Sequence, residues 1–371
     1  MNSRAGLYCV VSRRTLLGTG LMGLTGMSAG AQANAPLPLM AFPRDFGSHP
    51  VYQIEWWYIT GYAGATDASG LREFGFQLTF FRSRVAATQD MKSAFAAKQL
   101  IFAHAALTDV RGRRLVHDQR IARSSEVAGF DLASASESDT AIHLRDWSLV
   151  HEGRRYDAAL AANGFGLSLS FGETQPVLLQ GDQGLSRKGP RPSEVSHYYS
   201  EPHLAVRGAL RLGPQSFQVN DGAAWLDHEW SDELLDPQAV GWDWIGMNLD
   251  DGSALTAFRI RDNAGQAMWD GGSFRSAAGV LHTFHHGEVA FTPERRWKSP
   301  ATQTTYPVQW SVATPVGIYT VNAVLDNQEL DSRASTGAIY WEGLSNLADD
   351  QGRHIGRGYL EMTGYTQPLR L

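Results

Sequence analysis

Short segments rich in aromatic and β-branched residues recur along the whole chain, and turn-forming residues separate them. Such segments, alternating with polar residues over roughly four to eight positions, are typical of β-strands. Clear examples are residues 74–81, 166–171, 244–249 and 317–321. Asp250-Asp251-Gly252 lies between two apolar runs and predicts a β-hairpin. Because the best candidate for a helix is confined to residues 90–103, the pattern predicts an all-β fold.

The N-terminal segment has the features of an export signal. Ser12-Arg13-Arg14-Thr15-Leu16-Leu17 is a twin-arginine pattern, and an apolar run over residues 16–27 overlaps and follows it. Ala29-Gly30-Ala31-Gln32-Ala33 then has the small-residue spacing that a signal peptidase requires. The apolar run is too short to span a bilayer as a helix. We expect residues 1–33 to be a twin-arginine signal peptide and the mature protein to be periplasmic or secreted; a disordered basic tail is the alternative.

The mature chain, residues 34–371, contains no cysteine, because Cys9 is the only one in the sequence. Disulfides and a thiol nucleophile are thereby excluded, and the exported protein relies on its hydrophobic core. The leader also contains three arginines, which leaves 29 basic against 38 acidic side chains and a net charge of about −9. This charge argues against binding to nucleic acid or to anionic membrane surfaces.

The length of the mature chain suggests two domains, and a weak internal similarity supports this. Glu55-Trp56 precedes the segment Leu78-Thr79-Phe80-Phe81-Arg82, and Glu229-Trp230 precedes Leu255-Thr256-Ala257-Phe258-Arg259. Duplication of one β module explains the similarity, and chance resemblance between aromatic strands is the alternative. We place the domain boundary after a polar segment, residues 181–192, which is either a linker or a loop that covers a site. The expected domains are residues 34–204 and 205–371.

Two short motifs concentrate the residues with chemical potential. Trp225-Leu226-Asp227-His228-Glu229-Trp230 and Gly241-Trp242-Asp243-Trp244 together hold four tryptophans, three carboxylates and one histidine. Indole faces stabilise positive charge by cation–π attraction, and apolar surroundings raise a carboxyl pKa so that the group can donate a proton near neutrality. Alternatively, the tryptophans only pack and the charged residues face solvent.

These motifs, taken with others, resemble the AttH/CrtC family of lipocalin-like AttH proteins and carotenoid 1,2-hydratase-like proteins. The matching segments are residues 42–50, 55–61, 77–82, 103–106, 180–188, 196–200, 225–230, 241–244, 340–343 and 358–365. The resemblance covers nearly all of the mature chain and implies two tandem lipocalin-like β-barrel domains. A barrel of about eight strands can enclose one small ligand.

We therefore expect an aromatic pocket or inter-domain cleft that binds a hydrophobic ligand. The candidate ligand-binding residues come from the aromatic motifs and their flanks: Glu55, Trp56, Trp57, Tyr198, Tyr199, Trp225, Trp242, Asp243 and Trp244. A salt bridge to Arg82 is the alternative interpretation of Glu55. No cofactor is expected, and no metal: His282, His286 and Glu288 would share a strand face, but His282 lies apart and Gly287 suggests an exposed turn.

Water addition to an isolated alkene needs a protonated carboxyl group, a π-rich wall for the carbocation and a group that holds water. Asp227 is the candidate acid, Trp225 and Trp230 the wall, and His228 the water-orienting base. The resemblance implies that His228 and Trp230 match a His-x-Trp pair associated with activity in the hydratase branch. That branch also uses a Tyr and an Asp on a later strand, whereas residues 257–261 contain neither.

The geometry of a strand constrains this assignment. Alternate residues share a face, so Trp225, Asp227 and Glu229 lie on one side and His228 and Trp230 on the other. A regular strand cannot aim Asp227 and His228 at one point; either a bulge or turn is present, or one face alone is functional.

Two functions follow from the sequence. The first is an exported AttH-like protein that binds a lipid or isoprenoid-like ligand, with an ABC transporter as a possible partner. The second is a cofactor-free hydratase that protonates an isoprenoid double bond. An Asp227 with a raised pKa that points into a cavity favours the enzyme; pairing with an arginine weakens it.

Overall fold

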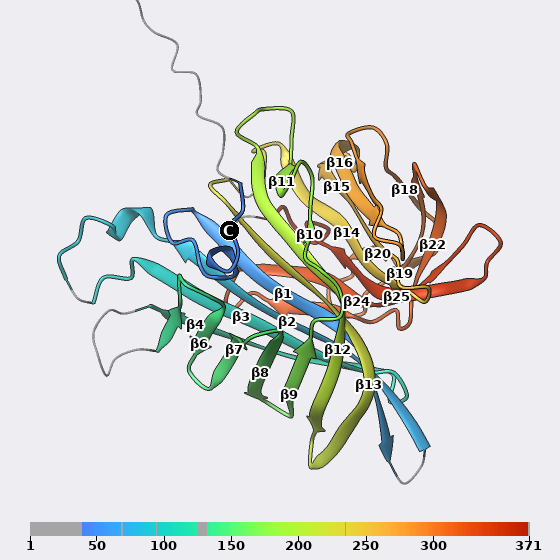
Figure 1. The fold of residues 1–371 in the computed structure, drawn as a ribbon, viewed down its shortest axis with the longest axis horizontal. Helices are drawn as coiled ribbons and strands as arrows, with labels where there is room; N and C mark the ends of the chain where they lie inside the picture. The colour runs from blue at the N-terminus through green and yellow to red at the C-terminus, as the bar shows by residue number, and fades with distance from the viewer. Residues whose placement is uncertain (1–38, 68–69, 94, 125–131, 234, 370–371) are drawn as a thin grey trace, which may run out of the picture. The chain divides into compact units, whose positions relative to one another are not determined.

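The computed structural model describes residues 39–67, 70–93, 95–124, 132–233 and 235–369. Strands dominate these residues, and the described helical segments are two three-residue 3-10 turns, η1 (Arg44–Phe46) and η2 (Ala86–Thr88). The predicted all-β class is confirmed (Figure 1). The segment assigned to a signal peptide, residues 1–33, lies outside the described residues. Among the described residues, no helix has the length and apolar character that crossing a bilayer requires.

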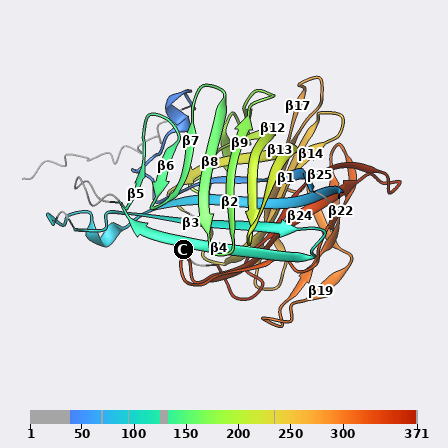
Figure 2. The ribbon, with the colours of Figure 1, turned by 90° about the horizontal axis from the view of Figure 1, so that it is seen from below.

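The first sheet forms a nearly closed barrel of antiparallel strands in the order β4-β3-β2-β1-β13-β12-β9-β8-β7-β6-β5. Its strands are β1 (Ile54–Asp67), β2 (Gly70–Arg84), β3 (Gln99–Asp109), β4 (Arg114–Arg123), β5 (Ala133–Ala135), β6 (Ala141–Leu144), β7 (Trp147–His151), β8 (Arg155–Ala162), β9 (Phe165–Gly172), β12 (Val195–Leu212) and β13 (Gln215–Ser231), with β10 (Leu178–Leu179) and β11 (Leu185–Arg187) paired to β12. Strands β3 and β4 approach β5 and β6 at the other end of the sheet, which brings the barrel close to closure (Figure 2).

The second sheet follows in the order β17-β16-β15-β14-β25-β24-β22-β21-β18. Its strands are β14 (Ala239–Leu249), β15 (Ala254–Asp262), β16 (Ala267–Arg275), β17 (Leu281–Phe284), β18 (Ala290–Pro293), β21 (Gln309–Thr314), β22 (Gly317–Ala323), β24 (Ala338–Ala348) and β25 (His354–Met362), with β23 (Glu329–Ser332) paired to β24. Strands β19 (Arg296–Lys298) and β20 (Thr305–Pro307) form a separate ribbon. The predicted hairpin at Asp250-Asp251-Gly252 joins β14 to β15, and Gly252 adopts the positive φ of 89° that this turn requires.

Two of the predictions from sequence were wrong. The boundary placed between residues 204 and 205 falls inside β12, because β12 pairs with β9 and β13 in the first sheet and β13 pairs with β1. The chain passes to the second sheet between Ser231 and Ala239. Residues 90–103 do not form the expected helix where they are described; residues 99–103 begin β3, whose pairing with β2 buries Ile101 and Ala103.

Large side chains fill both barrels. Trp57, Trp147 and Trp230 are buried in the first core, and Trp310 and Trp341 in the second. A third buried cluster joins the outer faces of the two sheets. Many of the aromatic side chains therefore pack in the cores of the two sheets. The space left for a ligand lies between the sheets.

Glycine allows the two sheets to approach closely. A Cβ added to Gly75 on β2 would lie 2.8 Å from the Tyr359 hydroxyl and 2.9 Å from the Leu344 Cβ of the second sheet. Hydrogen bonds cross the same contact, including one from Thr108 to Gln328 at 3.1 Å.

A polar network is buried in the first barrel around Glu55. The Glu55 Oε1 atom lies 2.7 Å from the His49 Nδ1 atom and 2.9 Å from the His228 Nε2 atom. Arg82, directly opposite on β2, donates to Oε2 at 2.7 Å. Burial alone would raise the pKa of Glu55, but hydrogen bonds from His228 and His49 and the charge of Arg82 hold this pKa well below its ordinary value. The alternative interpretation of Glu55, an ion pair with Arg82, is the one the structure shows.

Removing the guanidinium of Arg82 leaves a buried carboxylate without its cation. We expect Arg82→Met to lower the free energy of unfolding by about 3–5 kcal/mol, measured by urea denaturation. Arg295→Met, which removes an exposed pair with Asp326 (2.7 Å), is the matched control and should change stability little. Equal effects of the two variants would contradict the role of the network.

Candidate functional site

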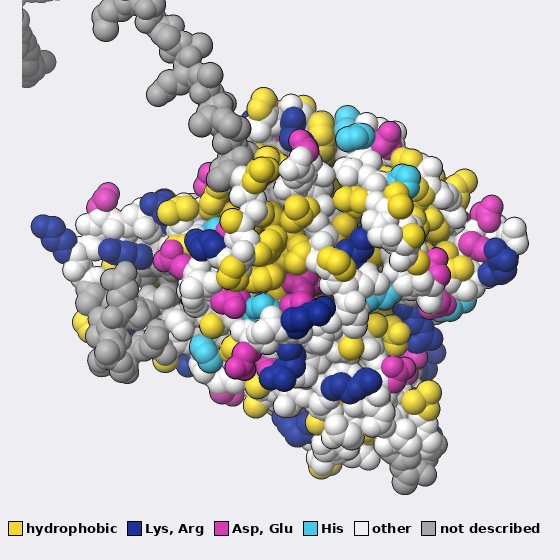
Figure 3. Space-filling view, in the orientation of Figure 1, with side chains coloured by type: hydrophobic (Ala, Val, Ile, Leu, Met, Phe, Trp, Pro, Cys, Tyr) yellow, Lys and Arg dark blue, Asp and Glu magenta, His cyan; other side chains and the backbone are white. Residues whose placement is uncertain are grey.

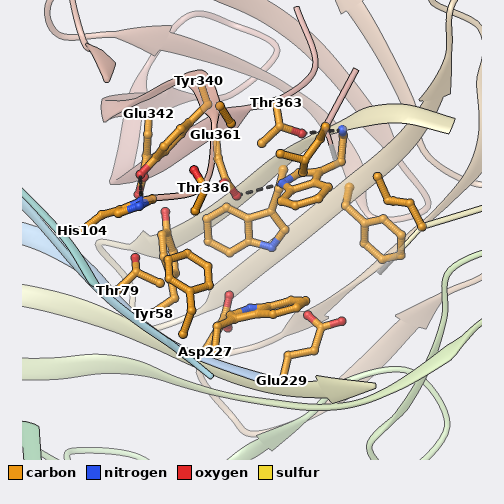
Figure 4. A pocket seen from close by; sticks show the side chains of 18 of the residues that line it. Tyr58, Thr79, His104, Asp227, Glu229, Thr336, Tyr340, Glu342, Glu361 and Thr363 are labelled. Carbon is orange, nitrogen blue, oxygen red and sulfur yellow. Dashed lines mark hydrogen bonds between the residues drawn. The ribbon is translucent and has the colours of Figure 1, made fainter. Parts of the chain in front are cut away.

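A cavity lies between the outer face of the first sheet and the facing side of the second (Figure 4). Strands β1, β2, β3, β12 and β13 supply one wall, and β14, β15, β24 and β25 supply the other. It contains about 1000 Å³ of space free of protein atoms, part of it open to solvent. Hydrophobic side chains gather on the surface where β10 and β14 are labelled in Figure 1, with acidic side chains beside them (Figure 3).

Aromatic rings make up most of the apolar wall. Tyr58 and Trp244, from opposite sheets, meet edge to face with centroids 5.4 Å apart. Trp56 and Phe258 extend this surface on β1 and β15. The Trp244 indole donates to the Tyr198 hydroxyl at 3.3 Å, which fixes the orientation of the ring. Such a wall favours a flat or unsaturated apolar guest and stabilises positive charge.

Asp227 places a carboxyl group in this wall, and no salt bridge joins it to a basic side chain among the described residues. Its Oδ1 atom accepts hydrogen bonds from Ser200 at 2.5 Å and from the Trp225 indole at 2.7 Å, and Oδ2 accepts one from Tyr198 at 2.9 Å. Burial raises the pKa of Asp227 to about 7, although these three hydrogen bonds work in the opposite direction. Asp227 is therefore available as a neutral acid near neutral pH.

Two more carboxyl groups face Asp227 from the second sheet. Glu342 on β24 and Glu361 on β25 are directly opposite each other across the strand pair; Glu342 is buried and Glu361 is partly buried. Burial raises the pKa of Glu361 to about 7, with a hydrogen bond from Trp242 (2.9 Å) opposing the shift and the charge of Asp227 adding to it. Burial and the charge of Glu361 raise the pKa of Glu342 well above its ordinary value.

The segment 181–192, predicted to be either a linker or a loop that covers a site, contributes one residue to the wall of the cavity. Strand β11, within this segment, pairs with β12, and Lys188 just beyond it lines the cavity. The Lys188 ammonium lies 2.9 Å from Glu229 Oε1 and 4.5 Å from the centroid of the Phe258 ring. A cation–carboxylate pair thus stands beside the aromatic wall.

His104 and Tyr340 form the inner side of the cavity. The His104 Nδ1 atom lies 2.9 Å from the Tyr340 hydroxyl, and its Nε2 atom lies 2.8 Å from the Ser335 hydroxyl. Burial lowers the pKa of His104 to about 3, so its ring is neutral at physiological pH and fixes the Tyr340 hydroxyl without adding charge.

The site residues predicted from sequence lie in three places. The cavity is lined by Trp56, Tyr198, Asp227, Trp242 and Trp244. Trp225 is buried behind Asp227, to which it donates. The remaining candidates are inside the barrels: Glu55, Trp57, Tyr199, His228 and Trp230 in the first, and Asp243 in the second.

Asp227 and His228 point to opposite sides of β13. From residue 225 to residue 231, β13 keeps a continuous register with β1, so neither a bulge nor a turn brings the two side chains together. His228 instead bonds to Glu55 and to the Tyr199 hydroxyl, 3.1 Å from Nδ1. Burial lowers the pKa of His228 to about 4, with Glu55 opposing the shift. This position makes His228 part of the barrel core.

His49, Glu55 and His228 also offer three donor atoms within 4.8 Å of one another, the spacing of a metal site. Both histidines already form hydrogen bonds with Oε1 of Glu55, and the Arg82 guanidinium donates to Oε2. A cation would have to enter beside this fixed positive charge, so we interpret the group as the structural network described above. His286, which belongs to the weaker metal candidate in the sequence, pairs with Asp270 instead: its Nδ1 atom lies 2.9 Å from Asp270 Oδ2.

Several lining residues were absent from the sequence-based candidates, above all Tyr58, Glu342 and Glu361. Tyr58 could have been inferred from Trp56, because the two share a strand face. Glu342 and Glu361 lie within motifs 340–343 and 358–365, but nothing in the sequence shows that their strands pair.

The fold and the cavity define an all-β protein with two barrels and a carboxyl-bearing aromatic site between them. The chain belongs to the AttH-like family, whose model matches residues 33–365. It is similar to the crystal structure of an AttH-type protein (NE1406) of Nitrosomonas europaea, with 45% identity over 89% of this chain and 98% of that one and a TM-score of 0.80. The lipocalin-like fold predicted from sequence is thereby confirmed.

A more distant structural relative is kievitone hydratase of Nectria haematococca. It is 14% identical over 90% of this chain and 94% of that one, with a TM-score of 0.66, a likeness that shows the fold alone. No curated protein matched the sequence.

The raised pKa values predict how stability depends on pH. Asp227 and Glu361 ionise near pH 4 in the unfolded chain but near pH 7 in the folded protein, so their stabilising contribution is complete below pH 4 and is lost as the pH rises through 7. We expect Glu361→Gln to reduce the loss of unfolding free energy between pH 5 and pH 8 by about 1–3 kcal/mol, measured by urea denaturation. Glu152→Gln, at an exposed position, is the control; the same pH dependence in wild type and Glu361→Gln would show that Glu361 does not have the raised pKa described above.

Proposed function

We propose that the protein binds an apolar, unsaturated small molecule between its two sheets and transfers a proton to it. The observation that carries this proposal is Asp227: a buried carboxyl group in an aromatic cavity, with a pKa of about 7 and with neutral hydroxyl and indole groups as its donors. An acid is most effective when its pKa lies near the working pH. The ion pair with arginine that would have weakened the proposal belongs to Glu55 instead.

The chemistry proceeds in balanced steps. Asp227 donates its proton to one carbon of a double bond, and the positive charge develops on the other carbon beside the rings of Tyr58 and Trp244. Water adds to this carbon and gives up a proton to a carboxylate such as Glu361, which is partly ionised at pH 7. Exchange of protons with solvent restores both groups. Loss of a proton from a neighbouring carbon, in place of water addition, would give an isomer.

Kievitone hydratase has the same fold, and its name places a water-adding enzyme on this architecture. At 14% identity the likeness concerns the fold, so the reaction class proposed here rests on Asp227 and its surroundings.

A carrier without chemistry is the second candidate, favoured by the extent of the aromatic wall around the cavity. In this proposal the protein holds a lipid or isoprenoid-like ligand for an ABC transporter. The twin-arginine pattern supports the further proposal that either activity takes place in the periplasm or outside the cell.

Heavy-oxygen labelling distinguishes these functions. The mature protein is mixed with a hydrophobic extract of its host in oxygen-18 water, and bound and released compounds are analysed by mass spectrometry. We expect a product that carries heavy oxygen, formed by wild type and reduced at least 100-fold in Asp227→Asn, because an amide cannot donate the catalytic proton. Asp221→Asn, at an exposed position on the same strand, is the matched control and should retain full activity.

A compound bound unchanged by wild type and by Asp227→Asn would establish the carrier instead. Product formation that survives in Asp227→Asn would assign the acid to another carboxyl group.

A further inference from the structure

Four buried oxygen atoms have no hydrogen-bond partner of acceptable geometry among the described residues, and the two residues Tyr58 and Glu342 that carry two of these atoms line the cavity. They are the hydroxyls of Tyr58 and Thr60, Gln77 Oε1 and Glu342 Oε1. Buried polar atoms in folded proteins are nearly always paired, and an unpaired one costs about 1–3 kcal/mol. Two such atoms on residues that line one cavity indicate a polar guest.

Tyr58, Thr60 and Gln77 belong to the first sheet and Glu342 belongs to the second. Thr60 and Gln77 are opposite each other on β1 and β2, next to the pair formed by Tyr58 and Thr79. Tyr58 reaches from the first sheet toward Glu342 on the second, and both line the cavity (Figure 4). They are near enough that the charge of Glu342 raises the pKa of Tyr58, after burial, the larger cause.

We propose that Tyr58 and Glu342 form a subsite for one neutral hydroxyl oxygen at the inner end of the cavity. The inference rests on the proposed function and deepens it, because it specifies a guest with an apolar body and a hydroxyl group at its buried end. That hydroxyl group belongs either to the ligand itself or to the water molecule that is added to the ligand. In the second case the water oxygen occupies the subsite before hydration and becomes the hydroxyl group of the product.

The surrounding groups select a neutral oxygen. A carboxylate guest would face the paired carboxyl groups of Glu342 and Glu361. An ammonium guest would offer no acceptor to the Tyr58 hydroxyl, nor to Glu342 in its protonated form. A hydroxyl group both accepts and donates, so it satisfies Tyr58 and Glu342 together.

The test uses four probes with one carbon skeleton and different ends: 2,6-dimethyloct-2-ene, citronellol, citronellic acid and citronellylamine. Dissociation constants are measured by quenching of tryptophan fluorescence, because Trp56, Trp242 and Trp244 line the cavity. We expect wild type to bind citronellol about tenfold more tightly than the hydrocarbon, the size of one or two hydrogen bonds. Tyr58→Phe and Glu342→Leu should abolish this preference, so that each variant binds citronellol and the hydrocarbon with equal affinity.

Tyr319→Phe is the control, because Tyr319 is a buried tyrosine in the core of the second sheet and does not line the cavity.

A second experiment incubates the hydrocarbon in oxygen-18 water with wild type and with Tyr58→Phe. Equal binding of alcohol and hydrocarbon, with heavy-oxygen uptake that Tyr58→Phe abolishes, would assign the subsite to water and support the proposal.

Equal binding of alcohol and hydrocarbon without heavy-oxygen uptake would contradict the subsite but not the apolar cavity. Tightest binding of the acid or the amine would overturn it as well. Failure of wild type to bind any of the probes would contradict the proposed function, and the subsite with it.

Discussion

The alternation of side chains along β1 and β13 is the constraint on which the site depends. Each strand has one face in the first barrel and one toward the second sheet, so consecutive residues enter different surroundings. Trp57 and His228 pack in the barrel, whereas Trp56 and Asp227 line the cavity. A shift of one position in the register would exchange these faces and bury Asp227 in the barrel core.

Glu55 and Asp243 differ from the carboxyl groups of the cavity in their counter-charge. Glu55 and Asp243 lie inside the barrels, each opposite an arginine on the next strand: Arg82 at 2.7 Å and Arg259 at 2.7 Å. Asp227, Glu342 and Glu361 lie between the sheets, where no arginine in the described part of the chain balances desolvation, and their pKa values are raised. Desolvation is thus accompanied by an ion pair with arginine at Glu55 and Asp243, whereas in the cavity it leaves the carboxyl groups as proton donors.

Sequence reasoning succeeded where the information is local. Alternation predicted the strands, the hairpin at Asp251-Gly252 and the separation of Asp227 from His228. It failed where distant strands pair. The similarity between the halves suggested that Glu229 corresponds to Glu55, but the register places Asp243 opposite Arg259, so the second module begins at β14. For the same reason the boundary at residues 204 and 205 was wrong, and Glu342 and Glu361 could not be recognised as neighbours.

The central claim is that the ligand binds between the sheets and not inside a barrel. A crystal structure of the mature protein soaked with a brominated alkene, with the anomalous signal of bromine as the marker, tests it most directly. The account predicts a bromine peak in the cavity, in contact with Trp56 or Trp244 and near Asp227. A peak inside either barrel, among the residues around Trp57 or Trp310, would contradict it.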